Sequence, residues 1–110
     1  MSTSIYAGNL LVLDPSDKRV ITFDWDTEAL PVGISITSSA WTITAIRQSG
    51  ATALTNDNAT IASSNRSTIT RLLATTATVG DIYRVSNKVT LDGSPAQEIE
   101  QQFKVLIQDQ

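Results

Sequence analysis

Histidine and cysteine, which supply many of the nucleophiles, general bases and zinc ligands of proteins, are both absent from this 110-residue chain. Without them the chain cannot assemble a Ser-His-Asp triad, a thiol nucleophile or a zinc site of the usual kind. The reactive groups that remain are carboxylates, amines and hydroxyls. We therefore expect a protein that is not an enzyme, with no catalytic residue and no cofactor.

One group of acidic residues has a spacing that could suit a metal ion. Asp24, Asp26 and Glu28 follow one another at every second position, and Asp14 and Asp17 are candidates to lie near them. Alternate residues of a strand share a face, so Asp24 and Asp26 could offer oxygens to a hard cation such as calcium. The spacing matches no calcium-binding loop, however. A solvated strand end is the favoured interpretation, and no metal site is predicted.

Two glycosylation sequons are present, Asn58-Ala59-Thr60 and Asn65-Arg66-Ser67. They matter only in a secreted protein. The first residues, MSTSIYAGNL, do not combine a basic segment with an apolar one, and no stretch approaches the roughly 20 apolar residues of a membrane span. We therefore expect synthesis and use without secretion or membrane insertion, and interpret the sequons as chance matches in a segment rich in Ser, Thr and Asn.

Length and charge restrict the protein to one domain with a small set of partners. A chain of 110 residues with 41% hydrophobic residues can bury one core without metal or disulfide. The net charge of −3, with scattered basic residues, argues against binding to nucleic acid or an anionic membrane. The lack of cysteine fits a reducing cytoplasm.

The elements that must carry any site are nearly all strands. Period-2 alternation of Val, Ile, Thr and aromatic residues recurs between clusters of turn-forming residues, and no segment has a helical pattern. Strands are predicted at 9–14, 19–26, 34–45 with a bulge or break at Ser38 and Ser39, around 60–62, at 67–74, and in two paired segments on either side of the turn at 92–96. About seven strands at this spacing predict an all-β, immunoglobulin-like antiparallel sandwich without a disulfide.

The start of the penultimate strand carries the features closest to an immunoglobulin domain. Tyr83 follows Gly80 and Asp81, as the tyrosine of a tyrosine corner would, with its hydroxyl returned to the backbone a few residues upstream. Val85 stands where that fold places a disulfide cysteine, and Trp41 where it places the core tryptophan. The expected core comprises Ile21, Phe23, Trp41, Ile43, Tyr83, Val85, Val89, Phe103 and Val105.

Three stretches resemble a known family: VLDPSDKRVITFDWD at 12–26, ISITSSAWTI at 34–43 and VGDIYRVSNKVTLDGSPAQEIEQQFKVLI at 79–107. In order they match a Leu-Asp-Pro-Ser opening, a strand ending in Asp-Trp, an Ile-x-x-Ser-x-Trp-x-Ile segment and a Gly-x-x-Tyr-x-Val-x-Asn hairpin. This order is similar to that of small immunoglobulin-like virion structural proteins of tailed bacteriophages, a fibre-tail adaptor-like family. The family has no catalytic residues to carry over.

The resemblance implies a virion protein, made in the cytoplasm of the host bacterium, whose partners are other virion proteins such as tail, connector or fibre subunits. An adaptor in the tail or neck, present in several copies that form a ring, would link the tail or connector to fibres. Two alternatives remain: a capsid decoration protein, and a carbohydrate-binding or hydrolytic sandwich. Sugar platforms use exposed aromatic residues, whereas both tryptophans fall on predicted core faces.

The N-terminal segment, residues 1–11, is separated from the sandwich domain at 12–110 and is either an arm or a first strand. Ile5 and Tyr6 have no evident strand partner in the sequence, and Leu10 and Leu11 begin an apolar run. An arm of this kind could add to the sheet edge of a neighbouring subunit. Ile5, Tyr6, Leu10 and Leu11 are therefore the candidate partner contacts, whereas Trp41, Tyr83, Val85 and Phe103 are expected to have structural roles.

Overall fold

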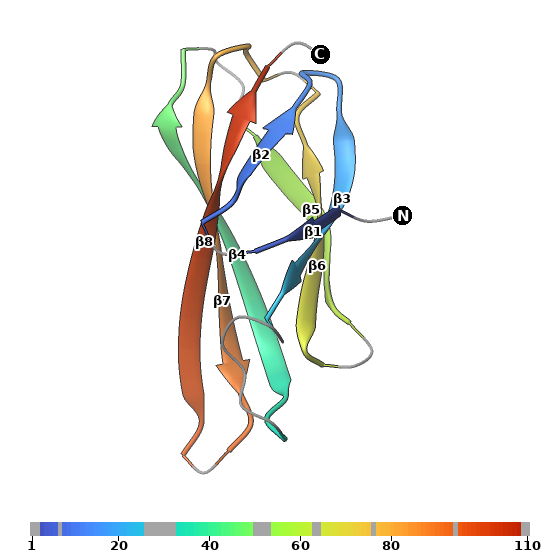
Figure 1. The fold of residues 1–110 in the computed structure, drawn as a ribbon, viewed down its shortest axis with the longest axis vertical. Helices are drawn as coiled ribbons and strands as arrows, with labels where there is room; N and C mark the ends of the chain where they lie inside the picture. The colour runs from blue at the N-terminus through green and yellow to red at the C-terminus, as the bar shows by residue number, and fades with distance from the viewer. Residues whose placement is uncertain are drawn as a thin grey trace.

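The computed structural model describes residues 3–6, 8–25, 33–49, 54–62, 65–75, 77–93 and 95–108, and these form two β-sheets packed face to face (Figure 1). None of the described residues lies in a helix. The eight strands are β1 (Thr3–Ile5), β2 (Leu10–Leu13), β3 (Lys18–Asp24), β4 (Ile36–Arg47), β5 (Thr55–Ile61), β6 (Ser67–Leu73), β7 (Ile82–Leu91) and β8 (Gln97–Ile107). The predicted all-β sandwich is confirmed, and its two-sheet arrangement is consistent with an immunoglobulin-like fold.

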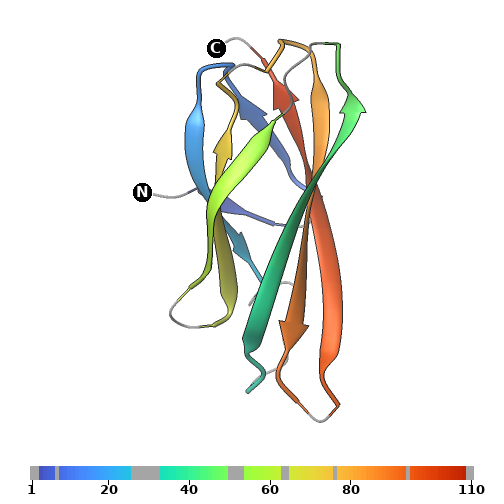
Figure 2. The same ribbon diagram turned by 180° about the vertical axis from the view of Figure 1, so that it is seen from behind.

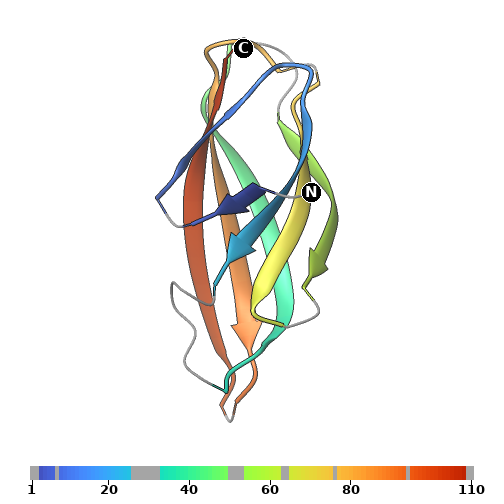
Figure 3. The same ribbon diagram turned by 45° about the vertical axis from the view of Figure 1, so that its right-hand side comes forward.

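The first sheet has the strand order β1-β3-β6-β5 and the second β2-β8-β7-β4. Neighbours within both sheets are antiparallel except for β1 with β3 and β2 with β8, which are parallel. These parallel pairs arise because the N-terminal segment crosses between the sheets, adding one short strand to each (Figure 3). The sequence pattern predicted neither the parallel pairs nor an eighth strand, since three- and four-residue strands carry almost no periodicity.

Strict alternation of inward and outward side chains specifies the two longest hairpin strands. In β7 the buried positions are every second residue from Tyr83 to Leu91, and in β8 they are Phe103, Val105 and Ile107, as the sequence parity predicts. One register irregularity lies between Ile36 and Ser38, next to the predicted bulge. The fully buried core side chains include Leu13, Ile21, Phe23, Trp25, Leu72, Tyr83, Val85, Val89, Phe103, Val105 and Ile107.

Both tryptophans were predicted on core faces, and the structure buries only one of them fully. Trp25, which is absent from the expected core set, is fully buried, with its ring centroid 5.1 Å from that of Phe23. Trp41 and Ile43 are only half-buried and pack against the margin of the core. The reason is that β4 is an edge strand and lies next to β5, the edge strand of the other sheet (Figure 2). Side chains at such a margin are covered on one side only.

A buried hydrogen-bonded network joins the two sheets at the level of Trp25. Its indole N–H donates to the side-chain carbonyl of Asn87 on β7 at 2.8 Å, and the hydroxyl of Thr68 on β6 donates to the same oxygen at 2.5 Å. The amide of Asn87 donates to the hydroxyl of Ser39 at 2.8 Å and to the carbonyl of Ala40 at 3.1 Å, both on β4. Because Trp25, Thr68 and Asn87 are fully buried, these bonds satisfy groups that water cannot reach.

The corner before β7 is held by Asp81 and not by Tyr83. The carboxylate of Asp81, which is 1% exposed, accepts hydrogen bonds from the backbone N–H and the hydroxyl of Ser49, each at 2.9 Å. Gly80, at a φ of 95°, donates its N–H to Ile107 at 2.7 Å. The Tyr83 hydroxyl is buried and meets the geometric criteria of a hydrogen bond with none of the described residues. The predicted return of this hydroxyl to the upstream backbone is therefore wrong.

Replacing Tyr83 with phenylalanine should leave the unfolding midpoint at neutral pH unchanged or slightly raised, a change below about 1 kcal/mol, because the lost hydroxyl is unpaired. Burial, and then the nearby Asp81 charge, raise the pKa of Tyr83 above 10.0. The unfolded tyrosine therefore ionises first as pH rises above about 10, and stability falls there. Urea unfolding measured across this pH range should show that Tyr83→Phe loses less stability at alkaline pH than the parent protein does. An equal loss in both proteins would contradict this account.

Candidate functional site

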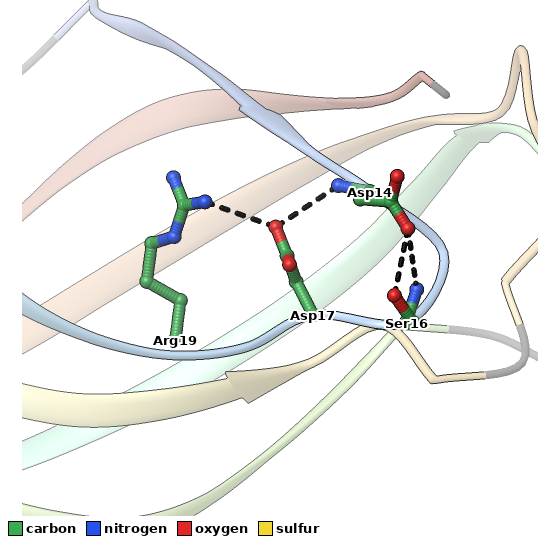
Figure 4. Close-up of polar contacts among 4 residues, drawn as sticks. All are labelled: Asp14, Ser16, Asp17 and Arg19. Atoms are coloured by element: carbon green, nitrogen blue, oxygen red, sulfur yellow. Dashed lines mark hydrogen bonds and ion pairs between the residues drawn. The ribbon is translucent and has the colours of Figure 1, made fainter. Parts of the chain in front are cut away.

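The acidic residues of the β2–β3 turn are all engaged in local hydrogen bonds (Figure 4). One carboxylate oxygen of Asp14 accepts from the backbone N–H of Ser16 at 3.0 Å and from its hydroxyl at 2.8 Å. Asp17 accepts from the backbone N–H of Asp14 at 3.0 Å and from the Arg19 guanidinium at 2.9 Å. These hydrogen bonds stabilise the turn between β2 and β3. They give a structural reason for the Leu-Asp-Pro-Ser sequence at residues 13–16.

The described members of the acidic group considered as a cation site, Asp14, Asp17 and Asp24, are not all brought together. Asp17 directly precedes β3 and Asp24 ends it, so the two lie about 20 Å apart along a seven-residue strand. The expectation that Asp14 and Asp17 lie near Asp24 is therefore wrong. Asp26 and Glu28 fall outside the described residues. Across the described ranges, no three Asp or Glu side chains gather where they could hold a metal ion.

Both sequon asparagines lie at backbone positions that favour asparagine. Asn58 has a φ of 54° within the irregularity of the β5–β6 pairing, and Asn65 has a φ of 58° in the turn before β6. Asparagine tolerates this left-handed conformation better than most residues. Local backbone geometry is thus a sufficient reason for an asparagine at each position.

The four residues proposed as partner contacts are divided between core and surface. Ile5 is 3% exposed and Leu11 7%, both inside the core, whereas Tyr6 is half-buried and Leu10 is 59% exposed. The expectation that Ile5 lacks a strand partner is wrong, because β1 pairs with β3 and sets Ile5 opposite Phe23. Of these four residues, Leu10 is the most exposed.

Deleting residues 2–9 should lower the midpoint of urea unfolding, because it removes β1, the buried Ile5 side chain and the bond from the Gly8 N–H to the Gln102 carbonyl. Burial of one isoleucine alone contributes roughly 2 kcal/mol. A truncated protein with the parent midpoint would show instead that the segment is an arm that adds nothing to this domain.

The margin between β4 and β5 forms a shallow groove lined by Ser39, Ala59, Thr60 and Ile61. The half-buried Trp41 lies on the same strand as Ser39, two residues further along and facing the same side. All six aromatic side chains of the chain fall within the described ranges, and each is buried or half-buried. The groove therefore lacks the exposed aromatic platform on which sugars stack.

The outer face of the second sheet carries an uneven distribution of charge. Arg84 on β7 lies directly opposite Lys104 on β8, and Leu10 on β2 lies on the other side of Lys104. The adjacent row consists of Val12, Leu106 and Ile82. We name this surface, Leu10, Val12, Ile82, Arg84, Lys104 and Leu106, the Arg84–Lys104 face.

Sequence reasoning missed both Asn87 and the Arg84–Lys104 face. Asn87 belongs to the Gly-x-x-Tyr-x-Val-x-Asn hairpin and occupies a buried parity position, where a polar residue should have indicated a network. The segments quoted for the resemblance supply Trp25, Ser39 and Asn87, which meet in that network. Arg84 and Lys104 are 20 positions apart, and only the β7–β8 register reveals that they are neighbours.

Comparison with known protein families gives a match over most of the chain. The model of a family described as podophage GP4 fiber-tail adaptor protein gp77 matches residues 13–106. No curated protein and no solved structure matches the chain. Within the described ranges, no helix has the length and apolar character needed to cross a membrane.

Proposed function

The chain belongs to the podophage GP4 fiber-tail adaptor protein gp77 family, and from this membership we propose that it is a structural, non-enzymatic protein of a bacteriophage virion. Its role is to link the tail or connector to fibres, in the tail or neck, through protein–protein contacts. The family match carries this proposal, since it runs from the end of β2 to the penultimate residue of β8 and so includes nearly the whole sandwich.

The architecture suits such a role. An adaptor must hold two partners at a fixed separation, and a sandwich with extents of 44 × 26 × 21 Å and one continuous core is a rigid spacer. We further propose several copies arranged in a ring. In a ring each weak contact is strengthened by the effective concentration that its neighbours impose. The chain is made in the host cytoplasm and functions in the particle.

Particles assembled from a phage genome with a stop codon in this gene test the proposal. Electron microscopy should show filled heads with tails that lack fibres, and addition of the purified chain should restore the fibres. Fibres that attach normally without the chain would overturn the adaptor role. Loss of capsid integrity with fibres still attached would favour a decoration protein instead.

A further inference from the structure

We propose that the Arg84–Lys104 face is a docking surface for an acidic, partly apolar segment of a neighbouring virion protein. The identification of that partner as a virion protein rests on the proposed function. The recognition chemistry rests on the face itself, which combines two adjacent cations with a row of aliphatic side chains.

The placement of the two cations is unfavourable for the isolated protein. Residues directly opposite in an antiparallel pair have Cβ atoms about 5 Å apart, and like charges there destabilise the sheet. Arg84 and Lys104 are both exposed, and neither has an ion-pair partner among the described residues, whereas Arg19, Arg71 and Lys88 each have a carboxylate partner. In a chain of net charge −3, two adjacent unpaired cations indicate a carboxylate supplied from outside.

The surroundings of Arg84 and Lys104 can accommodate a side chain of a partner protein. Arg84 and Lys104 border a shallow hollow whose other lining residues are Gly8, Gln102 and Phe103. An incoming carboxylate can therefore reach both cations from one side. Bidentate and charge-assisted bonds from arginine to a carboxylate are among the strongest that proteins form.

The apolar row favours protein over nucleic acid as the occupant. Leu10 is 59% exposed, and Val12, Ile82 and Leu106 are partly exposed on the same face. Further along β8, Glu98 and Glu100 are exposed, and they would repel a phosphate backbone that continued across the sheet. A peptide with acidic side chains next to aliphatic ones complements both halves of the Arg84–Lys104 face.

A matched pair of charge reversals tests the proposal on the intact chain. Arg84→Glu and Lys18→Glu both replace an exposed strand cation and change the net charge equally, but Lys18 lies on β3 of the other sheet. The probe is a short synthetic peptide of alternating Glu and Leu, with binding followed by NMR. Arg84→Glu should weaken binding at least about tenfold, with Lys18→Glu close to the parent. The unfolding midpoint of Arg84→Glu should stay equal or rise, since Glu would then face Lys104.

Several results would overturn the proposal: parental binding by Arg84→Glu, an equal loss in Lys18→Glu, or tighter binding of a DNA duplex to the same face. Fibre restoration in stop-codon particles gives a second test. The parent and Lys18→Glu should restore fibres and Arg84→Glu should not. Restoration by Arg84→Glu would contradict the proposal that the Arg84–Lys104 face is a docking surface. If even the parent fails to restore fibres, the adaptor role fails, and the peptide titration still decides whether this face binds acidic segments.

Discussion

Replacing Trp25 with alanine is expected to lower the free energy of unfolding by roughly 3–5 kcal/mol, which approaches the whole stability of a typical domain. Trp25 is fully buried, packs against Phe23 and donates its indole N–H to Asn87. Its removal leaves a cavity between the sheets and breaks a bond that joins them. Urea unfolding followed by circular dichroism measures the loss.

The matched variant is Trp41→Ala. Trp41 is half-buried at the sheet margin, 6.4 Å from Phe23 between ring centroids, and its loss should cost roughly 1–2 kcal/mol. The decisive result is which of the two variants loses more free energy of unfolding. If Trp41→Ala proves the more destabilising, then Trp41 is the core tryptophan, as the sequence alone predicted.

The second large effect is expected for Asn87→Ala, a loss of roughly 2–4 kcal/mol. The variant removes the oxygen that accepts from Trp25 and Thr68 and the amide that donates to Ser39, all within a part of the core closed to water. A buried polar group without a partner costs about 1–3 kcal/mol. The same denaturant experiment tests this, with Thr42→Ala on the exposed face of β4 as control.

Two results would count against the network. If Asn87→Ala lowers the free energy of unfolding no more than Thr42→Ala does, the buried polar groups find new partners or water in the variant. A similar small loss in Thr68→Val and Asn87→Ala would mean that the sheets are held by apolar packing alone. A graded order is expected instead, with the larger loss in Asn87→Ala, because that variant removes four hydrogen bonds whereas Thr68→Val removes only one of those four.

The longer strands could be predicted because their periodicity is local. Ile21 and Phe23 alternate with polar residues on β3, and Tyr83 to Leu91 do so on β7, which was enough to assign faces and core. The bulge near Ser38 was predictable for the same reason, since the parity of the apolar residues reverses there. Period-2 patterns indicate which face is buried, and here they did so correctly.

The features that could not be predicted depend on pairing between strands that are distant in the sequence. Whether Trp25 or Trp41 becomes fully buried depends on which strand lies at the sheet edge, and alternation along one strand does not contain that information. Ile5 pairs with Phe23 on β3, which lies 18 positions further along the chain, so the local sequence could not reveal this partner. The juxtaposition of Arg84 and Lys104 likewise follows from the β7–β8 register.

The most direct test of the adaptor role is the number and position of the chains in purified virions, obtained by quantitative mass spectrometry together with cryo-electron microscopy. The proposal predicts about 12 copies, or a small multiple, in a ring at the tail or neck beside the fibre attachment points. Hundreds of copies distributed over the capsid lattice would contradict it and would identify a decoration protein instead.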